Sequence, residues 1–168
     1  GVERYASGNV ELLRKGAKDV LRSLLSKGWE IVYASNSTGE KLRSCLGELS
    51  AEEGGPIRIR GSARKFVLTS DTGTSQTFAQ RAVRTDRGHY LEILEEEQPD
   101  IIIGDVFSLD LSLPAELRAK GISYLEKGLV LYKTEYTPSW ALQAAESTPG
   151  ISIVSSLAEF ESHLTSLA

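Results

Sequence analysis

One segment of the sequence delivers two carboxylates directly after an apolar run. Ile101 to Ile103 is followed by Gly104-Asp105, and a second aspartate, Asp110, comes five residues after the first. Mg²⁺ is a hard cation that prefers carboxylates, waters and substrate phosphate as ligands. The segment therefore predicts a Mg²⁺ site at Asp105 and Asp110. The alternative is a turn that ends a strand, with Asp110 or Ser112 capping the following helix.

A second segment follows another apolar run, Ile31 to Ala34, and reads Ser35-Asn36-Ser37. It lies between a predicted strand and a predicted helix, where free backbone N–H groups and the helix dipole favour an anion such as phosphate. Ser35 and Asn36 are therefore candidate phosphate-binding residues. The alternative is plain capping of the helix by Ser37, with the two preceding residues in a turn.

The elements that must position these loops alternate along the chain. Hydrophobic periodicity and capping signals predict helices at 10–27, at 37–49 with an S-x-x-E capping box, from about 86, around Pro114, from Thr137-Pro138, and after Ser156 with Glu159. Strands are predicted at 30–34, within 56–69, and at 101–103, 122–124, 129–132 and 151–154, while 70–76 is polar and typical of a turn.

Strands that alternate with helices indicate βαβ units and a mainly parallel sheet covered on both faces. The predicted fold class is thus α/β, a three-layer Rossmann-like domain. Ligands bind beyond the carboxyl ends of the strands in such folds, which selects the loops after Ala34 and Gly104. The prediction places these two residues at the ends of neighbouring strands.

Size and composition describe an ordinary globular protein. The 168 residues, 40% hydrophobic and 25% charged, fit one domain over 1–168. A net charge of −4 argues against nucleic acid and anionic membranes as partners, and no apolar run is long enough to span a bilayer. Cys45 stands alone, which favours the cytoplasm. Because the chain contains no Met, we expect the natural protein to begin before Gly1.

Taken together, the two loops resemble the second and fourth motifs of the haloacid dehalogenase (HAD)-like hydrolase superfamily. The matching residues are Tyr33 to Ser37, and Gly104-Asp105 with Asp110. The flanking stretches Lys15 to Gly28 and Ala119 to Ile122 also resemble that family, and the likeness covers about residues 13–124. It implies a Mg²⁺-dependent phosphatase, which hydrolyses the ester of a small phosphorylated molecule through a phospho-aspartate.

The family's third motif is a Lys or Arg near the start of the helix before the Gly-Asp strand. Arg84 and Arg87 occupy that region and are the candidate phosphate clamps, with Lys65 a weaker one. A guanidinium can grip phosphate through two parallel hydrogen bonds. For each of these residues, a solvated charge is the alternative.

The sequence departs from the family pattern in one important respect. HAD enzymes begin with a strand that ends in Asp-x-Asp, whose first aspartate attacks phosphorus, and nothing before Ser35 has that form. The nucleophile is therefore not in this chain. Either its segment precedes Gly1, or the protein is a catalytically inactive HAD-like binding or interaction protein.

A competing signal is Asp71-Thr72-Gly73, which resembles the active-site turn of aspartic proteases. Those enzymes need two such aspartates that share a proton, and their fold is all-β. Since the helical periodicity of this chain conflicts with an all-β fold, a tight turn in which Asp71 bonds its own backbone is the preferred interpretation.

Overall fold

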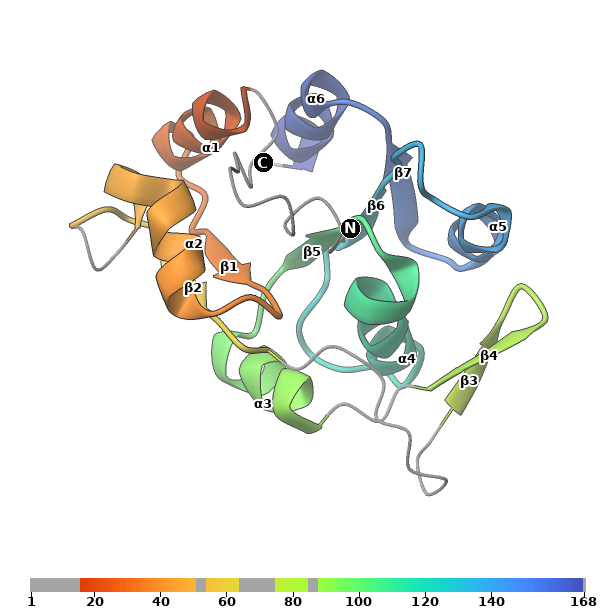
Figure 1. Cartoon of the computed structure of the whole chain (residues 1–168). Helices are drawn as coiled ribbons and strands as arrows, with labels where there is room; N and C mark the ends of the chain where they lie inside the picture. Colours follow the sequence, from red (N-terminus) through yellow and green to blue (C-terminus); the bar gives the residue numbers. More distant parts are fainter. Residues whose placement is uncertain (1–15, 51–53, 64–74, 85–87, 168) are drawn as a thin grey trace. The chain divides into compact units, whose positions relative to one another are not determined.

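The computed structural model describes residues 16–50, 54–63, 75–84 and 88–167 (Figure 1). The chain divides into two compact units, Gly1–Arg64 and Lys65–Ala168. Both units combine helices with strands, so the α/β class is confirmed. The prediction that residues 1–168 form one domain stays a prediction.

The first unit contains a pair of parallel strands with two helices. Its elements are α1 (Ala17–Ser26), β1 (Val32–Ala34), α2 (Gly39–Leu46) with a 3₁₀ turn (Gly47–Leu49), and β2 (Arg58–Arg60). β1 pairs with β2 in register from Val32↔Arg58 to Ala34↔Arg60. Leu46, Leu49 and Ile57 form the buried core of this unit.

Gly28 closes the first helix. Gly28 has a left-handed φ of 93°, its N–H donates to the Leu25 carbonyl, and the Trp29 N–H donates to the Leu24 carbonyl. This pair of bonds is the Schellman arrangement, which only a residue at ease with positive φ completes without strain. The helix therefore ends where the sequence indicates; the part predicted before residue 16 lies outside the described residues.

The predicted cap of the second helix is wrong by one residue. Thr38, not Ser37, is the N-cap of α2, and its Oγ1 accepts a hydrogen bond from the Lys41 N–H at 3.3 Å. Ser37 instead belongs to the turn, because its N–H donates to Ser35 Oγ at 3.1 Å. A cap needs an extended backbone immediately before the first helical residue, and Thr38 has it (φ −67°, ψ 152°).

The second unit holds a three-stranded parallel sheet and an antiparallel hairpin. Its elements are β3 (Ser75–Phe78), β4 (Arg81–Arg84), α3 (Gly88–Glu97), β5 (Ile101–Gly104), a π-helical turn (Phe107–Leu111), α4 (Ser112–Ala119), β6 (Gly128–Tyr132), α5 (Ser139–Ser147), β7 (Ile151–Val154) and α6 (Leu157–Leu167). The sheet order is β5-β6-β7 (Figure 1). Gly104 pairs with Leu131, and Leu131 with Ile153, so the three carboxyl ends lie together.

Most elements of this unit were predicted. The strands β5, β6 and β7 and the helices α3, α4, α5 and α6 fall at the expected positions, with Pro114 in the first turn of α4. The predicted cap of α6 is also confirmed, since the Glu159 N–H donates to Ser156 Oγ at 3.1 Å. The Glu159 carboxylate in return accepts from the Ser155 N–H.

Two predictions for this unit are wrong. Ile122 to Tyr124 forms no strand, because Gly121 (φ 78°) and Ile122 close α4, with N–H bonds to the carbonyls of Arg118 and Leu117. The region before α3 contains the hairpin β3–β4, and Ser75 and Gln76, predicted to end a turn, lie in β3. The remainder of the predicted turn, 70–74, and the end of the predicted strand, 64–69, lie outside the described residues.

Two clusters of buried side chains hold the second unit together. One surrounds Phe107 and includes the hairpin residues Phe78 and Val83 together with residues of β6 and α5. The other joins Tyr90 and Leu94 of α3 to Leu113 of α4. Phe107 contacts Phe78 and Trp140 edge to face, with ring centroids 5.0 Å and 5.9 Å apart. The π turn that follows β5 is therefore packed from more than one side.

Candidate metal and phosphate site

The backbone at the carboxyl end of β5 packs tightly against a carboxylate. A Cβ added to Gly104 would lie 2.3 Å from Asp110 Cβ and 2.6 Å from its Oδ2. Only glycine fits here, because real Cβ atoms do not approach other atoms so closely. The structure thus brings Asp110 to the residue that directly precedes Asp105. The Mg²⁺ site at the two aspartates stays a prediction.

The carboxylate of Asp110 is buried and hydrogen-bonded. The residue is 9% exposed, and its Oδ2 accepts a hydrogen bond from the Val106 N–H at 3.1 Å. The Asp110 N–H donates to the Val106 carbonyl at 2.8 Å, so two hydrogen bonds join Val106 and Asp110. A buried carboxylate is costly unless it is bonded in this way. Asp105, the residue between Gly104 and this loop, is half-buried.

The donor chemistry of this loop fits Mg²⁺. Among the described residues, no three His, Cys, Asp or Glu side chains gather as a complete metal site. Mg²⁺ commonly binds through one or two carboxylates and keeps waters and substrate phosphate as its other ligands. Asp105 and Asp110 would supply the carboxylates, and the chemistry supplied by the bound ion would be neutralisation of phosphate charge.

Ser35 lies at the carboxyl end of β1, as predicted. Its N–H donates to the Arg60 carbonyl at 3.1 Å, and its own carbonyl accepts from the Ala63 N–H at 2.8 Å. Its Oγ accepts from the Ser37 N–H at 3.1 Å, so that amide, a candidate phosphate donor in the sequence, already has an acceptor. The Ser35 hydroxyl hydrogen can still be donated to an anion.

The start of α2 is covered by the segment after β2. A Cβ at Gly61 would lie 2.3 Å from the backbone nitrogen of Gly39, the first residue of α2. The Ser62 N–H donates to the Ser37 carbonyl at 2.8 Å. Backbone therefore occupies the space in front of the first helical N–H, and within this loop Ser35 and Asn36 remain the predicted phosphate ligands.

The predicted phosphate clamps fall at the edge of what the structure describes. Arg84 ends β4 and pairs with Ser75 of β3, and its side chain is outside the described part of the molecule. Arg87 lies in the undescribed residues 85–87, immediately before α3, and Lys65 and Asp71 lie in the undescribed segment 64–74. Their roles stay predictions.

Sequence reasoning missed a residue that contacts this loop. Tyr90, on α3, is 3% exposed, and its hydroxyl donates to the Asp110 carbonyl at 2.9 Å. Its place among the buried residues of α3, with Ile93 and Leu94, indicates core packing alone. The available signal was Pro114, which stands four residues after Asp110 and cannot provide the helical N–H that its carbonyl would otherwise accept.

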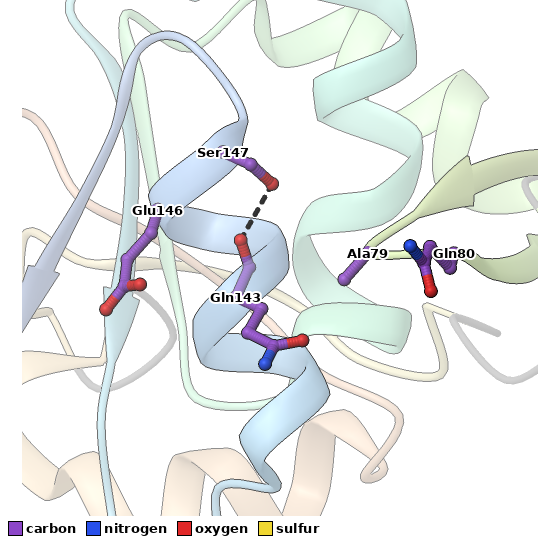
Figure 2. A pocket seen from close by; sticks show the side chains of 5 residues that line it. All are labelled: Ala79, Gln80, Gln143, Glu146 and Ser147. Atoms are coloured by element: carbon purple, nitrogen blue, oxygen red, sulfur yellow. Dashed lines mark hydrogen bonds between the residues drawn. The ribbon is translucent and has the colours of Figure 1, made fainter.

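A hollow of about 530 Å³ lies elsewhere in the second unit and is open to solvent. Figure 2 shows its five lining residues: Ala79 and Gln80 from the hairpin turn, and Gln143, Glu146 and Ser147 from α5. The Ser147 hydroxyl donates to the Gln143 carbonyl, within the helix. None of these five residues belongs to the predicted metal or phosphate site, and none is a nucleophile with an adjacent base.

Comparisons with known protein families, with curated proteins and with solved structures found no significant match to this chain. Among the described residues, no helix is long and apolar enough to cross a membrane.

Proposed function

We propose that this protein is a HAD-like phosphohydrolase with a three-layer Rossmann-like fold, which acts on a small phosphorylated molecule in the cytoplasm. The observation that carries the proposal is the loop after β5. There, Asp110 packs on Gly104 and its carboxylate accepts a hydrogen bond from the Val106 N–H, and these two residues flank Asp105 in the sequence. An acidic loop so tightly built at the carboxyl edge of a parallel sheet suits a Mg²⁺ site.

In this proposal the chain supplies binding and orientation, and the nucleophile comes from a segment outside the 168 residues. Asp105 and Asp110 hold the metal ion. Ser35 and Asn36 donate hydrogen bonds to phosphate oxygens that gain charge in the transition state. Arg84 or Arg87 clamps the phosphate. The aspartate nucleophile displaces the alcohol from phosphorus, and water then hydrolyses the aspartyl phosphate.

The second candidate is a catalytically inactive binding protein of the same fold. The observation that favours it is the lack of any Asp-x-Asp before Ser35 in the sequence. Such a protein would retain affinity for Mg²⁺ and phosphate, because the loops after β1 and β5 do not depend on the nucleophile for their hydrogen bonds.

A hydrolysis assay separates the two candidates. The product of the complete reading frame is incubated with p-nitrophenyl phosphate, with Mg²⁺ or with a chelator in excess. The enzyme hypothesis predicts Mg²⁺-dependent release of nitrophenol, a loss of at least about 100-fold in kcat/KM for Asp105→Asn, and a smaller loss for Ser35→Ala. If Mg²⁺ and inorganic phosphate bind but no ester is cleaved, the protein is the inactive binding protein.

A further inference from the structure

The backbone carbonyl of Asp110 lacks the donor that a regular helix would give it. In an α-helix that donor is the N–H of the residue four positions later, which here is Pro114. Proline has no N–H, and its ring crowds the carbonyl four residues before it. The chain widens at this place into the π turn Phe107–Leu111, where the Ser112 N–H donates to the Phe107 carbonyl.

Tyr90 provides a donor from a different element. Its hydroxyl reaches the Asp110 carbonyl at 2.9 Å, and its ring packs in the cluster formed with Leu94 and Leu113. A hydroxyl on a buried ring has little freedom to move, so this bond fixes the carbonyl in space. The Cα that carries the Asp110 carboxylate is fixed with it.

The same aspartate is held on its side-chain end as well. Oδ2 accepts from the Val106 N–H at 3.1 Å, and the side chain stands against the Gly104 backbone. Tyr90 from α3 and Val106 from the loop thus hold Asp110 at two points. A shift of either would move the carboxylate relative to Asp105.

We propose that Tyr90 is a positioning residue of the candidate Mg²⁺ loop, which holds the Asp110 carboxylate in place beside the end of β5. The role of Tyr90 in metal binding rests on the proposed function, whereas its hydrogen bond to the Asp110 carbonyl does not. Tyr90 would affect the metal ion only by fixing the position of Asp110.

A matched control exists in the same cluster. Tyr124 packs partly buried against the cluster that contains Tyr90. Burial, together with the Glu95 carboxylate, raises the pKa of its hydroxyl, so it is uncharged at neutral pH. Tyr124→Phe and Tyr90→Phe each remove one hydroxyl from this region, but of the two hydroxyls it is that of Tyr90 that donates to the Asp110 carbonyl.

The first measurement is hydrogen exchange of the Val106 and Asp110 amides, followed by NMR without metal. Tyr90→Phe should accelerate both on the order of fivefold to tenfold, because one buried hydrogen bond that keeps the loop closed is lost. Tyr124→Phe should leave both rates unchanged. Equal rates in the two variants would overturn the proposal, whether or not Mg²⁺ binds.

The second measurement is the Mg²⁺ concentration that gives half of the maximal rise in unfolding temperature. A positioning role predicts that Tyr90→Phe raises this concentration several-fold, while Tyr124→Phe leaves it at the wild-type value. A merely structural role would lower the metal-free unfolding temperature and leave the concentration unchanged. If wild type shows no response to Mg²⁺ while the exchange result holds, the proposed function fails and the hold on Asp110 stands.

A double-mutant cycle with Pro114→Ala tests the physical cause. That substitution restores an N–H at the position four residues after Asp110, so the carbonyl gains a second source of a hydrogen bond. Tyr90→Phe should then accelerate exchange less in the Pro114→Ala background than in wild type. An undiminished effect would show that the missing helical donor is not the reason for the contact, and would overturn this part of the proposal.

Discussion

A single residue, Gly104, leaves room at the end of β5 for the side chain of Asp110. The Asp110 side chain occupies the space where any other residue would carry its Cβ, within 2.3 Å of that position. The glycine of the Gly-Asp pair that follows the apolar strand is therefore needed for steric reasons. The glycine makes room for the second aspartate of the same loop.

We expect Gly104→Ala to displace Asp110 and to break its bond with the Val106 N–H. Overpacking of this kind typically costs about 1–3 kcal/mol of unfolding free energy, which chemical denaturation followed by circular dichroism measures. The control is Gly88→Ala in α3, where a Cβ meets nothing within 4 Å. Because alanine favours helix more than glycine, the control should be neutral or about 0.5–1 kcal/mol more stable. Equal losses in both variants would contradict the close approach at Gly104.

The sequence allowed the two aspartates to be placed on one loop, because apolar strand and spacing are local signals. Tyr90 could not be found in the same way, since its hydrogen bond depends on how α3 packs against the π turn. The cap of α2 was misplaced by one residue, because Ser37 and Thr38 are both good caps and the turn at Ser35 decides between them.

At the scale of elements, Arg118 ties the end of α4 to two loops of the second unit. Its Nε donates to the Leu125 carbonyl at 3.1 Å and its Nη1 to the Pro149 carbonyl at 3.2 Å. The guanidinium also lies where a Cβ of Gly150 would be, 1.5 Å away. One side chain thus fixes the loops that lead into β6 and β7, and β6 is the neighbour of β5 in the sheet.

We expect Arg118→Ala to lower the unfolding free energy by about 1–3 kcal/mol, because two carbonyls lose a charged donor. Lys120→Ala, at the residue that follows α4, is the control. Its ion pair with Glu116 (3.1 Å) joins a mostly exposed lysine to a carboxylate that is 11% exposed, and because the lysine end is open to water the pair contributes about 1 kcal/mol or less. Urea denaturation of the two variants compares the costs. A loss for Lys120→Ala as large as that for Arg118→Ala would contradict this role of the guanidinium.

The hairpin β3–β4 was the element that sequence reasoning did not find. Its turn, Ala79-Gln80, has two positive φ angles (48° and 67°) without the Gly or Asn that usually announces such a turn. Each of its strands has four residues and one described buried side chain, Phe78 in β3 and Val83 in β4. An apolar–polar alternation this short is not recognisable as a strand pattern in the sequence. Tertiary packing against Phe107 stabilises it instead.

At the scale of the whole molecule, the alternation of helices and strands predicted the α/β class and one mainly parallel sheet. The described strands pair in parallel as β1-β2 and as β5-β6-β7, while β3 and β4 pair antiparallel, and the placement of Ala34 and Gly104 on neighbouring strands stays a prediction. The α/β class and the parallel pairing follow from local periodicity and from the rule that parallel strands need crossover connections. The close packing at Gly104 and the hydrogen bond from Tyr90 follow from side-chain contacts between elements that are distant in sequence. Periodicity carries no information on such contacts.

The loop after β5 is proposed to bind a divalent ion through Asp105. The most direct measurement is the unfolding temperature of this chain with and without millimolar Mg²⁺ at constant ionic strength. Binding to the native state stabilises it by mass action, about 1.4 kcal/mol at ten times the dissociation constant, or roughly 3–6 °C for a chain of this size.

The matched variants are Asp105→Asn and Asp100→Asn, which neutralise carboxylates at opposite ends of β5. Asp100 is exposed, so its loss should leave the Mg²⁺ response intact. We predict that wild type and Asp100→Asn gain stability with Mg²⁺ and that Asp105→Asn loses most of that gain. Equal responses in wild type and Asp105→Asn, or none in wild type, would contradict the account.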